Sequence, residues 1–73
     1  MGTKTEPGQF DCYAAANPDE PIFVLLGRDK NAPDLVRRWA HERSRAGEDP
    51  VKVQEALDCA TAMDAYRLKR DML

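Results

Sequence analysis

The chain has 73 residues and a net charge of −2, from 11 Lys and Arg against 13 Asp and Glu. This length allows one domain with a small core, and the charge balance argues against binding of nucleic acids or membranes through bulk electrostatics. The longest apolar run, residues 22–26, is far too short to span a membrane, and no secretory signal precedes it. We therefore expect a cytoplasmic protein in which Cys12 and Cys59 stay reduced.

The N-terminal part of the chain shows no hydrophobic periodicity. Residues 1–9 are polar and contain Gly and Pro, which predicts a flexible tail before a single small domain formed by residues 10–73. Residues 10–13 are predicted to form a short strand or an extended anchor. Residues 14–21 follow as a connector, because their prolines prevent a helix there.

A strand is predicted for residues 22–26. They form a continuous apolar run with β-branched and aromatic members between Pro21 and Gly27, and the run is too short for a helix. Continuous rather than alternating hydrophobicity predicts that both faces of the strand are buried. Two short helices cover only one face of a small sheet, so we expect the other face to contact a second subunit. Whether residues 10–13 pair with this strand within one chain or between chains stays open.

The first helix is expected to begin near residues 29–33. Asp29 can accept hydrogen bonds from backbone N–H groups as the N-cap, and Pro33 is tolerated in the first turn. Gly47 is the expected C-cap residue that ends the helix. The apolar positions repeat at helical spacing and predict a buried stripe formed by Leu35, Val36, Trp39 and Ala40.

A second helix is predicted from Asp49-Pro50, the favoured order of N-cap and first helical proline, to about Arg70. It carries two adjoining apolar stripes, the first formed by Val53, Ala56, Leu57, Ala60 and Met63 and the second by Cys59, Ala62, Tyr66 and Leu73. Two stripes are wider than one antiparallel neighbour needs. We therefore predict an α+β fold, in which a short strand or strand pair precedes an antiparallel two-helix hairpin. We expect it to assemble as a homo-oligomer, which would supply the burial that so small a chain lacks.

A candidate ligand-binding site lies where the predicted strand meets the first helix. The N-terminus of a helix offers free N–H groups and a partial positive charge to an anion, Arg28 adds a bidentate donor, and Lys30 adds a point charge. The alternative is purely structural, with a glycine turn, a capping aspartate and a surface ion pair. Basic residues of the helix and one aromatic ring complete the candidate set, which is Tyr13, Gly27, Arg28, Asp29, Lys30, Arg37 and Arg38. Tyr66 stays open as an aromatic group at a pocket or an interface.

Catalysis and metal binding find little support in the sequence. A nucleophile needs a base and an orienting group, and the only histidine, His41, lies on a basic helical stretch. Cys12, His41 and Cys59 are the only soft metal ligands, and their spacing matches no zinc motif. We expect no enzymatic activity, no metal and no cofactor.

One block of the sequence carries a resemblance. It reads DEPIFVLLGRD at residues 19–29 and continues through Ala32-Pro33 and Leu35-Val36 to Trp39-Ala40. This block, with the upstream Asp11-Cys12-Tyr13, resembles a group of small uncharacterised proteins encoded by bacteriophages and prophages of proteobacteria, over about residues 10–66. The resemblance carries no functional residues. It implies an accessory phage-type protein in the host cytoplasm, and small proteins of that type often counter host defence.

The sequence leaves three functions open. The leading hypothesis is a non-enzymatic binding protein that sequesters an anionic, nucleotide-like signal molecule, an anti-defence activity if the resemblance holds. The alternative is a protein-interaction module that inhibits a host defence protein by direct binding. The third is a minor structural or regulatory phage component. The expected partners are a second copy of the chain and either an anionic small molecule or a host protein, with no membrane, and the net charge disfavours nucleic acid.

Overall fold

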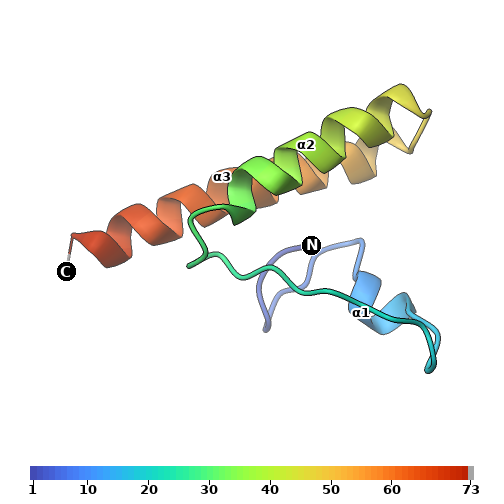
Figure 1. Ribbon diagram of the computed structural model, residues 1–73, viewed down its shortest axis with the longest axis horizontal. Helices are drawn as coiled ribbons and strands as arrows, with labels where there is room; N and C mark the ends of the chain where they lie inside the picture. The colour runs from blue at the N-terminus through green and yellow to red at the C-terminus, as the bar shows by residue number, and fades with distance from the viewer. Residues whose placement is uncertain (73) are drawn as a thin grey trace.

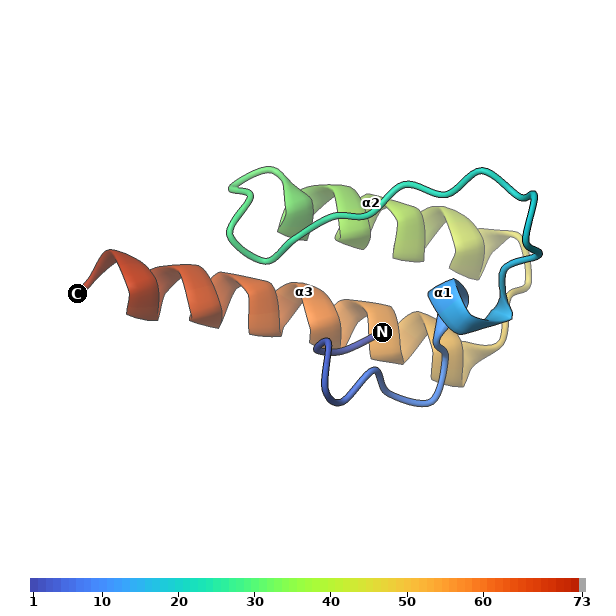
Figure 2. The ribbon, with the colours of Figure 1, turned by 90° about the horizontal axis from the view of Figure 1, so that it is seen from below.

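The computed structural model describes residues 1–72, which contain three helices: α1 (Cys12–Ala15), α2 (Ala32–Arg45) and α3 (Pro50–Asp71). The two long helices form an antiparallel hairpin, and the N-terminal half of the chain lies along one side of it (Figures 1 and 2). Leu73, assigned above to the second apolar stripe, lies outside the described residues. In residues 1–72, the helices are too short or too polar to cross a membrane.

Local sequence chemistry accounts for the turn between α2 and α3. Gly47 has a φ of +85°, and the N–H groups of Gly47 and Glu48 donate to the carbonyls of Ser44 and Arg43 at 3.1 and 3.0 Å. This is the hydrogen-bond pattern of a Schellman C-cap, which favours glycine in the left-handed position. The Asp49 carboxylate then accepts from the N–H of Val51 at 2.9 Å. The predicted glycine stop and Asp-Pro restart are both confirmed.

The start of α2 differs from the prediction. Its N-cap is Asn31, whose side chain makes no capping hydrogen bond, and Pro33 lies in the first turn as expected. Asp29 lies in a tight turn outside the helix, where its carboxylate accepts from the N–H of Asn31 at 2.9 Å and its carbonyl accepts from Ala32 at 3.0 Å. The prediction of Asp29 as N-cap is therefore wrong, because an Asx-type turn takes up its side chain two residues earlier.

The seam between α2 and α3 is made of small side chains. Ala32, Ala40, Ala56 and Ala60 are 0% exposed, and no large side chain is fully buried in the described part of the chain. Trp39, predicted to lie in the core, is 39% exposed, and the Lys52 ammonium lies 6.0 Å from its ring centroid. Alanines let the two helix backbones approach closely, so the larger apolar side chains lie at the edges of the seam instead of inside it.

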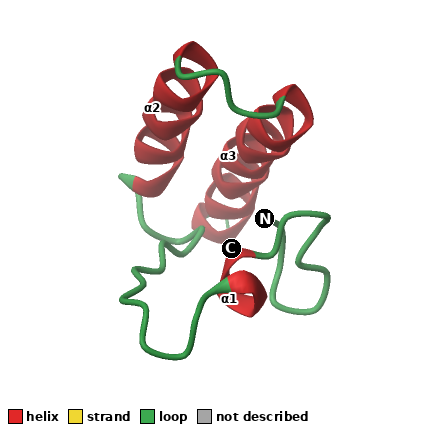
Figure 3. Ribbon diagram, turned by 90° about the vertical axis from the view of Figure 1, so that its right-hand side faces the viewer, coloured by secondary structure: helices red, strands yellow, loops and turns green. Residues whose placement is uncertain are grey.

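The predicted strand is absent, and the α+β assignment is wrong: residues 1–72 form helices and loops only (Figure 3). Residues 22–26 are extended, but the main-chain groups of residues 22–25 make no hydrogen bond to any other described residue. Residues 10–13, the possible partner strand, are not extended throughout either, because residues 12–15 form α1. The Asp11 carboxylate caps that helix by accepting from the N–H of Ala14 at 3.2 Å. A strand requires a paired backbone, and this chain supplies none.

The expected burial of residues 22–26 is wrong as well. The Phe23 side chain is 86% exposed and Val24 is 61% exposed, while Leu25 alone in the run is half-buried. The run therefore lies on the surface of the single chain, beside the hairpin. Most of its apolar side chains are not covered by other residues of the described fold.

The first ten residues lie against the N-terminal half of α3, where they are bound by Glu55. Its carboxylate accepts from the N–H groups of Gln9 and Phe10 at 3.0 and 3.1 Å and pairs with the Met1 ammonium at 2.7 Å. These bonds lower the pKa of Glu55, the largest effect being that of the ammonium. One carboxylate thus joins the segment predicted as a tail to α3, while the mobility of residues 1–9 stays a prediction.

Candidate functional site

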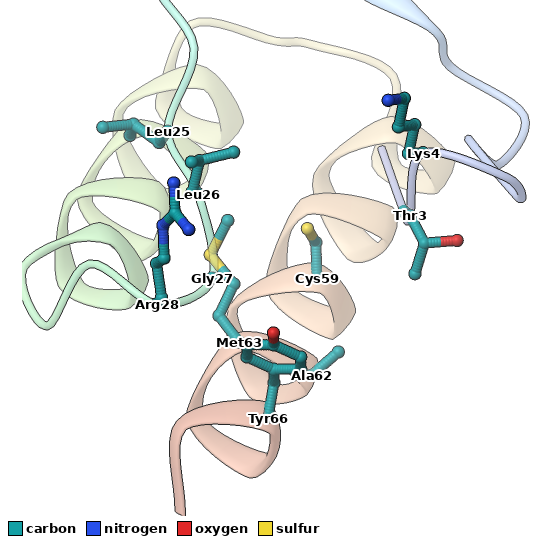
Figure 4. Close-up of a pocket in the computed structure, with 11 residues that line it drawn as sticks. Thr3, Lys4, Leu25, Leu26, Gly27, Arg28, Cys59, Ala62, Met63 and Tyr66 are labelled. Atoms are coloured by element: carbon teal, nitrogen blue, oxygen red, sulfur yellow. The ribbon is translucent and has the colours of Figure 1, made fainter. Parts of the chain in front are cut away.

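An open cavity of about 630 Å³ lies between the turn before α2 and the middle of α3 (Figure 4). Three parts of the chain line it. They are Gly2, Thr3 and Lys4 from the N-terminal loop, Leu25, Leu26, Gly27 and Arg28 from the extended segment, and Cys59, Ala62, Met63 and Tyr66 from α3. The volume lies within the range of small-molecule sites in proteins, about 300–1,000 Å³.

The turn at residues 26–29 positions one wall of the cavity. The Leu26 carbonyl accepts from the N–H of Asp29 at 3.0 Å, which directs Gly27 toward α3. A Cβ atom added at Gly27 would lie 3.6 Å from Met63 Cγ and 3.8 Å from Tyr66 Cδ1. Gly27 does not have a positive φ. These are ordinary van der Waals distances, so the turn lies next to α3 and neither the space there nor the backbone conformation requires a glycine.

The charged groups of the cavity are both positive. Arg28 and Lys4 lie on opposite sides of it, with Cys59 and Met63 between them (Figure 4). Within residues 1–72, neither cation makes a hydrogen bond or an ion pair. A guanidinium with free N–H groups can bind a phosphate or carboxylate in bidentate fashion. The cavity therefore combines an apolar wall with donors for an anion.

Two α3 side chains determine the character of that wall. Tyr66 is 58% exposed and presents an aromatic ring at the mouth of the cavity. Burial raises the pKa of the Cys59 thiol, so the thiol stays protonated at neutral pH and acts as a small apolar group. The wall can contact a flat, uncharged part of a ligand, and it offers no activated nucleophile.

The structure brings together only part of the predicted site. Gly27 and Arg28 line the cavity, and the exposed residues Asp29 and Lys30 follow directly after them. Tyr13 lies on α1, which the extended segment separates from this turn (Figures 1 and 2).

The two arginines of α2 do not line the cavity. The Arg37 guanidinium binds the carboxylates of Asp34, at 3.3 Å, and of Asp64 on α3. The Asp64 hydrogen bond is the main reason that the pKa of Arg37 is raised. Arg38 is exposed on α2. Arg37 thus links α2 to α3 through an ion pair, and its guanidinium is already bound to two carboxylates.

Sequence reasoning missed Lys4 and Met63 as site residues. Lys4 belongs to the segment predicted as a tail, and Met63 was assigned to an apolar stripe. Tyr66, which the sequence left open as a pocket or interface residue, lines the cavity. Its position one helical turn after Met63 was the available signal, because residues three apart share a helix face.

The three potential soft metal ligands lie on three different helices: Cys12 on α1, His41 on α2 and Cys59 on α3. Among residues 1–72, no three His, Cys, Asp or Glu side chains are grouped in a way that could hold a metal ion. Both cysteines are free. Comparisons with protein-family models, curated proteins and solved structures found no match to this chain.

Proposed function

We propose that this protein is a non-enzymatic binding protein that holds an anionic, nucleotide-like small molecule in the cavity between residues 25–28 and α3. The observation that carries the proposal is that the unpaired guanidinium of Arg28 and the exposed ring of Tyr66 line the same cavity. A nucleotide has the matching chemistry, since its phosphate suits a guanidinium and its base stacks on an aromatic face. Sequestration of such a signal molecule is the anti-defence role implied by the resemblance to phage proteins.

Isothermal titration calorimetry against linear and cyclic nucleotides tests the proposal. We expect Arg28→Ala to weaken binding by about 1.5–3 kcal/mol, the range for a hydrogen bond to a charged group. Arg38→Ala is the matched control, because it removes an arginine that does not line the cavity. The absence of heat with every nucleotide, for a folded wild-type protein, would contradict the proposal. Equal losses in the two variants would contradict the position of the site.

A second candidate function is direct inhibition of a host protein. It is favoured by the apolar side chains that the chain leaves exposed, Phe23 above all. Affinity capture from a bacterial lysate separates the two candidates. An inhibitor retains one foreign protein in stoichiometric amount, whereas a protein that sequesters a small molecule retains none and releases a nucleotide when denatured.

A further inference from the structure

Residues 22–26 are a continuous run of large apolar side chains on the surface of the described chain. Four of its five side chains are exposed by about half or more: Ile22 by 52%, Phe23 by 86%, Val24 by 61% and Leu26 by 49%. Scattered apolar side chains are normal on protein surfaces, but a contiguous patch marks an interaction site. Water therefore contacts a segment whose composition is that of a core.

The segment is also free of charge. Residues 21–27 contain no Asp, Glu, Lys or Arg. The other exposed apolar side chains at the C-terminal end of the fold, Leu68 and Met72, lie among Arg67, Lys69, Arg70 and Asp71. Depletion of charge distinguishes the centre of an interface from the rest of a surface. By this criterion, residues 22–26 have the composition of an interface centre, and the end of α3 does not.

The chain exposes more surface than a compact monomer of its mass. A compact monomer of 8.2 kDa is expected to expose about 4,500 Å², whereas this chain exposes 6,024 Å². Its radius of gyration is 12.8 Å, against about 11.2 Å for a compact domain of this length. The excess of about 1,500 Å² per chain would amount to about 3,000 Å² in a pair, within the range of obligate homodimers.

We infer that a second copy of this chain covers residues 22–26 and that the apolar side chains of this segment form the centre of a self-association interface. A two-fold contact places the same segment of each copy at the interface. An uncharged segment can meet its own copy without like-charge repulsion. This inference does not rest on the proposed ligand, although Leu25 and Leu26 belong both to the segment and to the cavity wall. It requires no change in the secondary structure of the segment.

Light scattering after size-exclusion chromatography tests the inference with Phe23→Ser. Because Phe23 is 86% exposed, its truncation removes little packing within the chain. We expect the wild-type protein to have a mass at a multiple of 8.2 kDa, and the variant to have a dissociation constant raised by about ten- to a hundredfold, with its helical circular dichroism unchanged. Met72→Ser is the control, since Met72 is 85% exposed but lies outside the segment.

A second pair of variants tests whether the effect depends on the segment and not on Phe23 alone. Val24 and Leu68 are 61% and 64% exposed, so Val24→Asp and Leu68→Asp place the same charge on equally exposed apolar sites. Only Val24→Asp is expected to dissociate the assembly. A monomeric wild-type protein would overturn the inference, and so would equal dissociation of both variants. A wild-type chain that is monomeric until it binds a host protein would assign the segment to that protein instead.

Discussion

The alanine seam makes Ala60 the most informative position for testing the hairpin. Ala60 is 0% exposed between α2 and α3 and does not line the cavity described above, and Ala60→Leu adds three carbon atoms to this seam. Overpacking of this kind costs about 1–3 kcal/mol. A chain of this length has a total stability of about 4–11 kcal/mol, so the change removes a large fraction of it. The expected decrease in Tm is about 4–8 °C for each kcal/mol lost.

Thermal unfolding followed by circular dichroism at 222 nm measures the effect, with Ala65→Leu as the control. Ala65 is exposed on the same helix, and alanine and leucine have similar helix propensities, so this variant is expected to stay within about 0.5 kcal/mol of the wild type. A Tm for Ala60→Leu equal to that of the control would refute the close approach of the two helices at this position.

Three further predictions concern polar and backbone features. Glu55→Gln is expected to lower the Tm at neutral pH. The folded-state pKa of Glu55 is lowered by the Met1 ammonium and by the Phe10 and Gln9 N–H groups. The stabilisation by Glu55 is therefore present above its unfolded pKa of about 4.3 and is lost as the pH falls through the folded-state pKa. A Tm difference between variant and wild type that does not shrink in acid would contradict this. Double-mutant unfolding of Arg37→Ala and Asp64→Ala should give a small coupling energy that salt weakens, since both side chains are partly exposed. A large coupling energy that salt does not change would disprove the surface character of the pair. Gly47→Ala should lower the free energy of unfolding by about 1–2 kcal/mol, because a φ of +85° disfavours a residue with a Cβ. No atom lies within 4 Å of the added methyl group, so this cost comes from the backbone conformation and not from a clash. Gly47→Asn should lower the stability less, and chemical denaturation ranks the two variants.

The features that the sequence predicted correctly depend on neighbouring residues. Gly47 ends one helix and Asp49-Pro50 starts the next, because caps are built from atoms within a few residues of each other. The strand at residues 22–26 was predicted wrongly because a strand also needs a partner that is distant in sequence. The apolar run was recognised, but nothing local showed that residues 12–15 would form α1 and leave it unpaired.

The candidate site follows the same rule. Gly27 and Arg28 were predicted because the turn and its cation are adjacent in the chain. Lys4 and Met63 were missed because the N-terminal loop and α3 reach the cavity only through tertiary packing. Arg37 was taken for a ligand-binding residue, and the sequence did not show that Asp64, on the other helix, would bind its guanidinium.

The bonds to Glu55 have a consequence for the order of folding. They join residues 45 and 46 positions apart in the sequence, whereas α2 and α3 are joined by a short turn. Contacts that are local in sequence form faster than distant ones, because less loop entropy is lost in closing them. We therefore expect the hairpin to form first, and Gln9 and Phe10, although they leave the ribosome long before Glu55, to dock only after α3 has been synthesised. During translation, the apolar residues 22–26 are thus exposed before either long helix, α2 or α3, is available to pack beside them.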